Sequence, residues 1–447
     1  MSFDTVLIAN RGEIALRVIE ACRELGLQSI AVYSEADAGM PYLRLADRAV
    51  CIGPAEAAKS YLNIAAIISA AELSGAGAIH PGYGFLAENP DFVEVCEDHG
   101  LAFIGPPRGV MKLLGDKVAA REAVAVTGVP VLPGCPMPDE ASALYDAADD
   151  VGYPILIKSV YGGGGRGMRW VDSPDELVSK ASAAAEEAKG ATGDASLYLE
   201  KALVSPRHVE VQILADRFGT VLHLGERECS IQRRHQKLIE EAPAPNLAPE
   251  IREAICAAAL TAARAVEYRN AGTVEFVVAP DGAFYFIEMN ARIQVEHSVS
   301  EMVCGMNLIK EQIRVALGEP LSHDPNDVAV RGHAIECRVN AEDPDKNFIP
   351  SCGTVAIESI PGGHGVRFDS ALYQGMRVEP YYDSLIGKVL AWGETRDEAT
   401  VRMVTALQRL RLSGIQTTTP LLLEILAHPA FRTGEIDTGF LEKHILT

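Results

Sequence analysis

The chain has 447 residues, 48% of them hydrophobic, and its 61 acidic and 40 basic side chains give a formal net charge of −21. A chain of this length is expected to form about two to four domains, with enough apolar residues to bury a core in each. The acidic surface would repel nucleic acid and anionic membranes, so neither is an expected partner. Anionic substrates would therefore need local clusters of basic residues.

Cysteine usage and hydropathy indicate where the chain works. Its nine cysteines include no CxxC pair, which is typical of reduced thiols and favours a cytoplasmic location. No uninterrupted apolar run approaches the roughly 18 residues that a membrane span needs. The apolar run at residues 5–9 is too short for a signal peptide.

The first region alternates strand and helix patterns. Residues 5–9 predict a strand, and residues 14–25 carry an apolar stripe at helical spacing. Gly26 would end that helix, and residues 29–33 predict the next strand. The same order continues to about residue 105. This alternation predicts an α/β fold with a parallel, doubly wound sheet.

Two further regions differ from the first in composition and pattern. From residue 116 to about 309, glycine-rich loops and strand pairs alternate with long helices, which we expect at residues 174–189 and 251–266. After Pro320 and Pro325, strands are predicted at residues 334–339 and 389–392, and helices at 396–410 and 420–426. These regions mix their elements, so α+β organisation is expected in parts of the chain.

Residues 272–290 predict a β-hairpin, because Asp281-Gly282 between apolar runs is typical of a two-residue type I′ turn. Counting outward from that turn places Glu275 opposite Glu288, with Cβ atoms about 5 Å apart. Asn290 shares the face of Glu288. Two carboxylates and an amide oxygen are ligands that suit Mg²⁺. Spacing alone equally allows both glutamates to face solvent.

The same pattern continues beyond the hairpin, where Glu288, Asn290, Arg292, Gln294 and Glu296 alternate with apolar residues. If this stretch is extended, the polar side chains share one face. An amphipathic edge strand is the ordinary interpretation. A face that carries metal ligands, a cation, an amide and a free carboxylate in sequence would also suit an oxyanion that must lose a proton.

A glycine-rich loop lies at residues 158–168, which read KSVYGGGGRGM. Four consecutive glycines stabilise neither helix nor strand, but they allow several backbone N–H groups to approach a phosphate. A flexible linker is the alternative. Lys158, at the end of an apolar strand, argues against a linker because it fixes a cation beside the loop. The segment lacks the GxxxxGK[ST] pattern of a P-loop.

Two basic features stand out in this acidic chain. Arg233, Arg234, His235 and Lys237 cluster within residues 226–245, where a solvated run of charge is the usual alternative. Arg338 lies in the strand-like run 334–339, and a lone arginine there is most often an ion-pair partner.

Together these segments resemble the biotin carboxylase family of the ATP-grasp superfamily. The resemblance covers essentially the whole chain and rests on IANRGEIALR, HPGYGFLAEN, GDK, GGGGRGM, QRRHQK, EMNARIQVEH, CRVNAEDP and PYYDSLIGK. GGGGRGM alone would suggest only an ATP-grasp enzyme. The resemblance implies a Rossmann-like domain at residues 1–114, an ATP-grasp domain at 115–318 with a glycine-rich lid at about 131–203, and a mixed α/β domain at 319–447.

The resemblance also implies a set of nucleotide-binding residues. Those expected to contact ATP are Lys117, Lys158, Gly163, Gly164, Gly165, Met168, Glu200, Lys201, Leu203, His208, Gln232, His235, Glu275 and Glu288. In relatives of this kind the two lysines bind phosphates, the glycines cover them, and the segment around Leu203 contacts adenine. Glu275, Glu288 and Asn290 would hold two Mg²⁺ or Mn²⁺ ions, in agreement with the hairpin spacing.

The remaining roles concern bicarbonate and biotin. Lys237, Arg292, Gln294 and Val295 match the family's bicarbonate pocket. Glu296 matches the general base, Arg338 the residue that faces the biotin ureido oxygen, and Tyr83 a residue that lines the biotin pocket. The implied reaction is ATP-dependent carboxylation of biotin by bicarbonate through carboxyphosphate.

The sequence departs from the family pattern at a few positions, none of which removes a catalytic group. Tyr161 stands where relatives usually extend the glycine run, Ala291 and Ser298 replace the usual Thr and Pro, and Cys352 replaces a common Pro.

The family's biotin attachment signature, Met-Lys-Met, is absent, and Met111-Lys112-Leu113 is the nearest match. Biotin is therefore expected on a separate biotin carrier protein, and a carboxyltransferase is expected as a further partner. An acyl-CoA carboxylase such as acetyl-CoA carboxylase, acting in fatty acid synthesis, is the expected context. A homodimer is also implied, and Glu20 and His364 at its expected interface predict a weak one.

Two other functions remain possible from the sequence. Another ATP-grasp ligase that makes an acyl phosphate is disfavoured by Arg338 and by the PYYDSLIGK segment. An inactive ATP-binding regulatory subunit is disfavoured because Glu296 and Lys237 are both present.

Overall fold

The computed structural model describes residues 3–138, 140–161, 168–324 and 327–446. Its N-terminal part is a five-stranded parallel sheet with strand order β3-β2-β1-β4-β5. The strands are β1 (Thr5–Ile8), β2 (Gln28–Tyr33), β3 (Arg48–Cys51), β4 (Ala78–His80) and β5 (Ala102–Phe103), and the main helices are α1 (Gly12–Glu24), α2 (Ile64–Ser74) and α3 (Pro90–Asp98).

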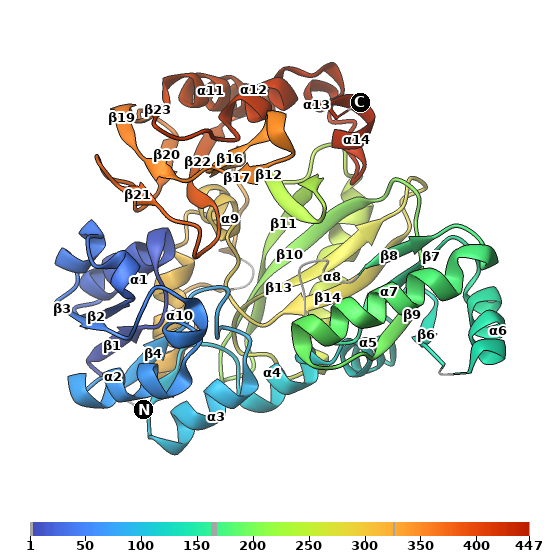
Figure 1. Cartoon of the computed structure of the whole chain (residues 1–447), viewed down its shortest axis with the longest axis horizontal. Coiled ribbons are helices and arrows are strands. Elements are labelled where there is room, and N and C mark those ends of the chain that lie inside the picture. The colour runs from blue at the N-terminus through green and yellow to red at the C-terminus, as the bar shows by residue number, and fades with distance from the viewer. Residues whose placement is uncertain (1–2, 139, 162–167, 325–326, 447) are drawn as a thin grey trace.

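Helices cover both faces of this sheet because its strands are apolar on both sides. Val6 and Ile8 pack with α1, whereas Leu7, which points the other way, packs with α2. The prediction of a parallel, doubly wound sheet is therefore confirmed. This region lies at one end of the molecule in Figure 1.

Helices α4 (Arg108–Gly115) and α5 (Lys117–Ala125) lead into a small four-stranded antiparallel sheet with order β6-β9-β7-β8. Its strands are β6 (Gly134–Pro136), β7 (Ile155–Ser159), β8 (Arg169–Val171) and β9 (Leu197–Lys201), accompanied by α6 (Ala141–Val151) and α7 (Pro174–Thr192). Ile155 and Ile157 form its own core with Leu177 and Ala184 of α7. Figure 1 shows this part at the opposite end from the N-terminal sheet.

A large antiparallel sheet joins the middle of the chain to the C-terminal part, with order β14-β13-β10-β11-β12-β15-β22-β20. Its strands are β10 (Arg207–Ala215), β11 (Val221–Arg233), β12 (Gln236–Ala242), β13 (Asn270–Val278), β14 (Phe284–Asn290), β15 (His333–Asn340), β20 (Val366–Asp369) and β22 (Leu385–Gly393). Helices α8 (Pro249–Ala265), α9 (His297–Cys304) and α10 (Leu308–Leu317) pack around it.

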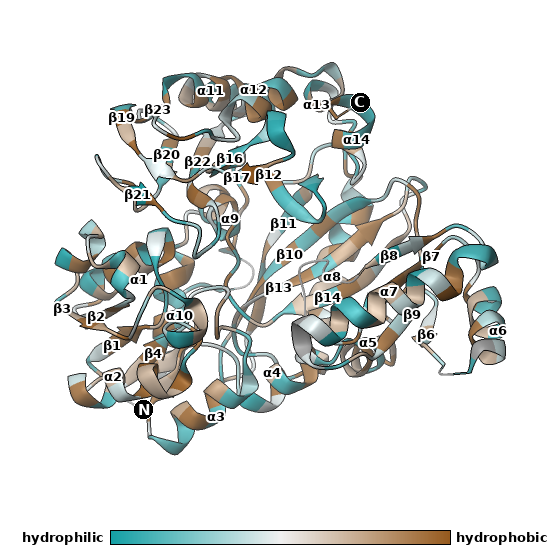
Figure 2. Ribbon diagram, in the orientation of Figure 1, coloured by the Kyte–Doolittle hydropathy of each residue, from teal (hydrophilic) through white to brown (hydrophobic). Residues whose placement is uncertain are grey.

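The C-terminal part adds short strand pairs and a helical layer. The strands are β16 (Glu342–Asp343), β17 (Ile349–Pro350), β18 (Gly353–Thr354), β19 (Ala356–Ser359), β21 (Arg377–Val378) and β23 (Arg411–Ser413), and the helices are α11 (Arg396–Arg409), α12 (Thr419–Ala427), α13 (Pro429–Thr433) and α14 (Phe440–His444). Figure 2 shows hydrophobic and hydrophilic residues alternating along α11 and α12, as expected for helices with one buried face. Among the described residues, no helix is both long and apolar enough to cross a membrane.

The hairpin formed by β13 and β14 differs from its prediction at the turn. Gly282 donates its N–H to the Ala279 carbonyl at 2.9 Å, so Pro280 and Asp281 are the central turn residues. Only Gly282 has a positive φ, of 90°, whereas a type I′ turn needs positive φ at both central residues. The predicted Asp281-Gly282 type I′ turn is therefore wrong, because proline at the preceding position favours the common turn with negative φ.

Candidate active site

The predicted metal ligands lie on β13 and β14. Glu275 pairs directly with Glu288 across the two strands, after a bulge next to Phe276. Asn290 donates from Nδ2 to Glu275 Oε1 at 2.8 Å. Lys117 Nζ lies 3.4 Å from Glu288 Oε2 and partly balances its charge. These oxygen donors from neighbouring strands suit a hard cation such as Mg²⁺.

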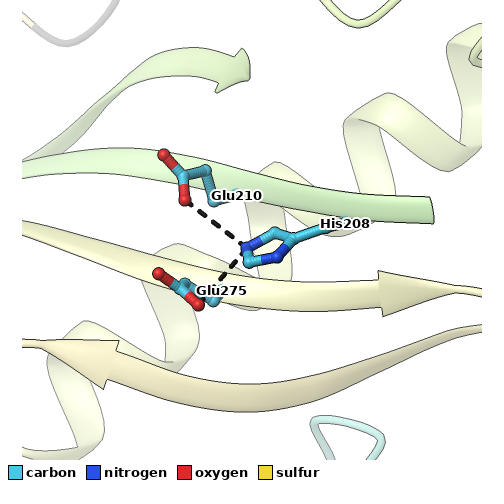
Figure 3. Close-up of side chains that lie close together, drawn as sticks. All are labelled: His208, Glu210 and Glu275. Carbon is cyan, nitrogen blue, oxygen red and sulfur yellow. Dashed lines mark ion pairs between the residues drawn. The ribbon is translucent and has the colours of Figure 1, made fainter. Parts of the chain in front are cut away.

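His208 projects from β10 toward two carboxylates, as Figure 3 shows. Its Nε2 lies 3.3 Å from Glu275 Oε2 and 3.6 Å from Glu210 Oε2. Burial alone would lower the pKa of His208, but Glu275 and Glu210 raise it to about 9. The imidazole is therefore a cation at neutral pH, and it contributes to offsetting the acidic charge of the two glutamates.

Lys237, on β12, lies at the centre of three buried glutamates. Its Nζ is 2.6 Å from Glu210, 2.5 Å from Glu296 and 3.3 Å from Glu275. Burial opposes its charge, yet these carboxylates raise the pKa of Lys237 well above its usual range. A fixed cation thus stands between the predicted metal ligands and the predicted base.

Glu296 directly precedes the helix α9 and is held by a cation on each carboxylate oxygen. Lys237 contacts Oε1, and Arg338 donates from Nη2 to Oε2 at 2.8 Å. Burial would raise the pKa of Glu296, but Lys237 and Arg338 lower it. Glu296 is therefore ionised at neutral pH, as a general base must be.

Arg338 extends from β15 and is also paired with a second buried carboxylate. Its Nε donates to Glu240 Oε1 at 2.6 Å. Burial would lower the pKa of Arg338, but Glu240 and Glu296 raise it. The guanidinium keeps its charge and one edge is directed at the predicted base.

The stretch from Glu288 to Glu296, whose polar side chains would share one face if it were extended, is only partly a strand. Strand β14 ends at Asn290, and residues 291–294 are irregular before the turn into α9. The alternation of buried apolar and polar side chains persists nonetheless. Gln294 donates from Nε2 to Glu275 Oε1 at 2.9 Å, and Arg292 donates from Nε to Glu88 Oε2 at 2.9 Å. The expectation that the whole stretch is extended therefore holds, as a strand, only as far as Asn290.

Several residues predicted to contact nucleotide lie on β7 and β9 of the small four-stranded sheet. Lys158 pairs with Glu200, which also accepts from Arg121 Nη1 at 2.5 Å. Lys201 Nζ donates to the carbonyls of Gly152 and Tyr153. The remaining predicted contacts are the half-buried Met168 and Leu203, the buried Gln232 and the exposed His235 in the β11–β12 turn. Gly163, Gly164 and Gly165 lie outside the described residues.

Tyr83, predicted to line a biotin pocket, is half-buried and donates its hydroxyl to Glu13 Oε1 at 2.5 Å. Val295, predicted in the bicarbonate pocket, is half-buried directly before Glu296. The structure thus gathers Glu275, Asn290, Gln294, Lys237, Glu296 and Arg338 through direct contacts, whereas Tyr83 reaches the cluster only through its neighbours.

Sequence reasoning missed three residues that hold this centre together: Glu210, Arg227 and Glu240. Arg227 is fully buried and donates to Glu210, Gln212, Ser300, Thr273 and Gln294. A signal for Glu210 was available, because polar residues alternate with valines along the apolar strand β10. Two adjacent glutamates directly after the apolar Leu238 and Ile239 of β12 were the corresponding signal for Glu240.

Models of three domain families match the chain. Residues 2–111 match the biotin carboxylase N-terminal domain, residues 116–324 the ATP-binding domain of the carbamoyl-phosphate synthase L chain, and residues 336–443 the biotin carboxylase C-terminal domain.

Full-length relatives agree with these matches. The chain is 53% identical over 444 residues to a biotin carboxylase of Pseudomonas aeruginosa, covering 99% of this chain and 98% of that protein. It is 52% identical over 445 residues to a biotin carboxylase of a Nostoc species, covering 99% of both chains.

Two solved structures are similar to this chain over almost its whole length. A Campylobacter jejuni biotin carboxylase in complex with β,γ-ATP has a TM-score of 0.97 at 47% identity, covering 99% of both chains. The biotin carboxylase domain dimer of a Hydrogenobacter thermophilus 2-oxoglutarate carboxylase, with MgADP, ADP and bicarbonate, has a TM-score of 0.96 at 46% identity, covering 99% of this chain and 98% of that one.

Proposed function

The chain belongs to the biotin carboxylase family, and we propose that it uses ATP and bicarbonate to carboxylate biotin held on a separate carrier protein. The observation that carries this proposal is the position of Glu296. A buried, ionised carboxylate lies between Lys237 and Arg338, so a base and two oxyanion-binding cations meet at one point.

The first half of the reaction activates bicarbonate. Glu296 takes the bicarbonate proton, while Lys237 and Arg292 hold the negative charge. The bicarbonate oxygen then forms a bond to the γ-phosphorus as the bond to ADP breaks, which yields carboxyphosphate. Lys117 and Lys158 would stabilise the phosphate charge. Glu275, Glu288 and Asn290 would hold two Mg²⁺ or Mn²⁺ ions, which supply further charge neutralisation at the phosphates.

The second half transfers the carboxyl group. Carboxyphosphate separates into CO₂ and phosphate, and the phosphate takes the proton from the ureido nitrogen of biotin. Arg338 stabilises the enolate-like ureido oxygen while the nitrogen attacks CO₂. The double pairing of Arg338 with Glu240 and Glu296 supports this role, because it fixes the direction of the guanidinium.

A steady-state assay tests the proposal. ATP hydrolysis is expected to require both bicarbonate and Mg²⁺ and to rise when free biotin is added. ATP turnover at an equal rate in bicarbonate-free buffer would refute the proposal, since the bicarbonate pocket would then have no part in catalysis.

The carrier and the carboxyltransferase are proposed as separate partners, with an acyl-CoA as the final acceptor. Because no Met-Lys-Met signature is present, co-expression with a biotin ligase is expected to leave the intact mass unchanged. Addition of a biotinylated carrier is expected to accelerate ADP release. A biotin adduct on the purified chain would contradict the assignment of a separate carrier.

A further inference from the structure

Lys388 is a lysine with no exposed surface, on β22 directly opposite Arg338 of β15. Lysine is almost never fully buried unless its charge is paired, because removing an ammonium from water is costly. None of the steps of the proposed reaction uses Lys388, although it lies on the strand next to that of Arg338.

Lys388 contacts the turn that carries Glu296, at residues 295–298. Its Nζ donates to the backbone carbonyl of Val295, the residue directly before Glu296. It also donates to Ser298 Oγ at 2.8 Å, two residues after Glu296. One ammonium therefore holds the chain on both sides of the general base.

Two buried carboxyl groups lie within 4 Å of the ammonium. Glu336 Oε2 lies 3.6 Å from Lys388 Nζ, and Glu13 Oε1 lies 3.8 Å from it. Neither oxygen of Glu336 has a hydrogen-bond partner among the described residues. Burial raises the pKa of Glu336 well above its usual range, although the nearby Lys388 lowers it. Glu13 also accepts from Tyr83, which connects the N-terminal domain to the same lysine.

We propose that Lys388 is a positioning residue for Glu296: it fixes the Val295–Ser298 turn so that the carboxylate stays aimed at bicarbonate. The inference rests on the proposed function. The ion pairs of Glu296 with Lys237 and Arg338 do not by themselves keep its carboxylate in place throughout the reaction. Lys237 and Arg338 are the cations that the substrates themselves recruit, so their hold on Glu296 weakens when the site fills. The bond from Lys388 goes to the backbone and is unaffected.

The local backbone supports this assignment. The segment from 291 to 294 is irregular, and the carbonyl of Glu296 accepts a three-residue turn bond from Val299 N that is long, at 3.3 Å. Ser298 Oγ also donates to Asp369 Oδ2 at 3.2 Å. Asp369 in turn forms an ion pair with Arg367 at 2.7 Å. The base is thus fastened to β20 and β22 of the C-terminal domain.

Three variants and one control test the proposal. Lys388→Met removes the ammonium, Lys388→Arg keeps the charge, and Ser298→Ala removes one of its two anchors. Arg396→Met is the matched control, because Arg396 makes a buried pair with Glu241 on β12 at 2.7 Å, away from Glu296. Bicarbonate-dependent ATPase is measured with each substrate varied in turn.

Lys388→Met is expected to lower kcat/KM for bicarbonate about 10–100-fold, as for displacement of a positioned group, while KM for ATP changes less than about threefold. Lys388→Arg should restore part of the loss, and the control should leave the bicarbonate KM unchanged. The proposal would be overturned if Lys388→Met changed KM for ATP as much as it changed kcat/KM for bicarbonate. It would also be overturned if kcat/KM for bicarbonate did not change.

If Lys388→Met does not fold, Ser298→Ala decides: a selective rise in the bicarbonate KM supports the proposal, and an unchanged value overturns it. Absence of bicarbonate dependence in the wild-type protein would instead refute the proposed function itself.

Discussion

At the scale of single residues, Glu296 and Arg338 form one ion pair but act on different substrates in the proposed reaction. Glu296→Ala is expected to abolish most ATP hydrolysis, because bicarbonate keeps its proton and carboxyphosphate does not form. Arg338→Ala is expected to retain bicarbonate-dependent ATPase but to lose carboxybiotin. Each loss should be about 10²–10⁴-fold. Phosphate release and carboxybiotin yield, measured on the same samples, check the division.

The two variants provide each other's control, because each removes one partner of the same buried pair. Loss of structure alone would reduce both activities together. Equal loss of ATPase and carboxylation in both variants would therefore contradict the separate roles.

His80 gives the N-terminal domain a pH-dependent stability. Burial lowers the pKa of His80 to about 4, from an ordinary value near 6.5. Its Nδ1 accepts the Gly82 N–H at 3.0 Å, which the neutral ring can do. Between about pH 4 and pH 6.5, His80 is therefore protonated in the unfolded chain but neutral in the folded chain. The stability from neutral His80 is fully present above about pH 6.5, falls progressively below it, and is lost by about pH 4.

The expected loss is about 3 kcal/mol in the free energy of unfolding, at 1.36 kcal/mol per pKa unit. About 2 kcal/mol of this loss is expected between pH 7.5 and pH 5, and urea unfolding of the wild type and of His80→Asn at those two pH values measures it. Asn retains an acceptor for Gly82 but does not titrate. A wild-type midpoint that falls no more than that of the variant would count against this assignment.

At the scale of secondary-structure elements, Arg227 joins β11 to β10, β13 and the catalytic segment. It donates to Glu210 at 2.6 Å and to Gln294 at 2.9 Å, with no exposed surface. Arg227→Met is expected to lower the free energy of unfolding by about 3–5 kcal/mol, because it leaves Glu210 buried with one cation fewer. It should also weaken bicarbonate binding through Gln294.

Arg252→Met is the comparison for that prediction. Arg252 pairs with Glu226, the neighbour of Arg227, but its side chain is 34% exposed. A smaller loss of stability and unchanged bicarbonate kinetics are expected there, as measured by chemical denaturation and by the ATPase assay. Equal losses of stability and equal changes in bicarbonate kinetics in the two variants would contradict the prediction that the buried Arg227 contributes more than Arg252.

The elements could be predicted well where local patterns determine them. Helix α1 and strands β15 and β22 lie within a few residues of their predicted positions. The pairing of Glu275 with Glu288 is confirmed, yet it arises differently from the prediction. The turn uses one residue more than expected, and a bulge at Ile287 restores the register. Two local irregularities cancel, which a count along the sequence does not reveal.

The sequence predicted those residues of the candidate site that lie within recognisable motifs. The contacts of Lys237, Glu296 and Arg338 connect residues that the resemblance had already singled out. Glu240 and Lys388 were not predicted, because their positions depend on the pairing of β12 with β15 and of β15 with β22. Pairing between strands that are far apart in the sequence, as Ile239 is from Cys337 and Arg338 from Lys388, leaves no local trace.

At the scale of the whole molecule, we predict a homodimer that dissociates more readily than is usual for relatives. The expected interface combines residues 17–24 and 361–367. Within one chain, Arg17 and Arg367 both pair with Glu301, while Glu20 and His364 remain exposed. An acidic Glu20 and a less apolar His364 would each weaken a twofold contact by about 1–2 kcal/mol, which lowers affinity more than about tenfold.

Sedimentation velocity from nanomolar to micromolar concentration checks this prediction. A shift from monomer to dimer within that range is expected. A single dimer boundary at low nanomolar concentration would contradict it, and would instead indicate a compensating pair such as Glu20 with Arg367 of the partner subunit.

The eight-stranded sheet has a consequence for anyone who wishes to use part of this protein. Strand β12 hydrogen-bonds to β15 across the predicted domain boundary at residue 318, from Ile239 opposite Cys337 to Ala242 opposite Ala334. A fragment that stopped at the boundary would expose the unpaired backbone edge of β12, and an exposed strand edge can recruit other chains into aggregates. The nucleotide-binding half is therefore not a transplantable module, and fusions or exchanges with other carboxylases should be joined outside β12–β22.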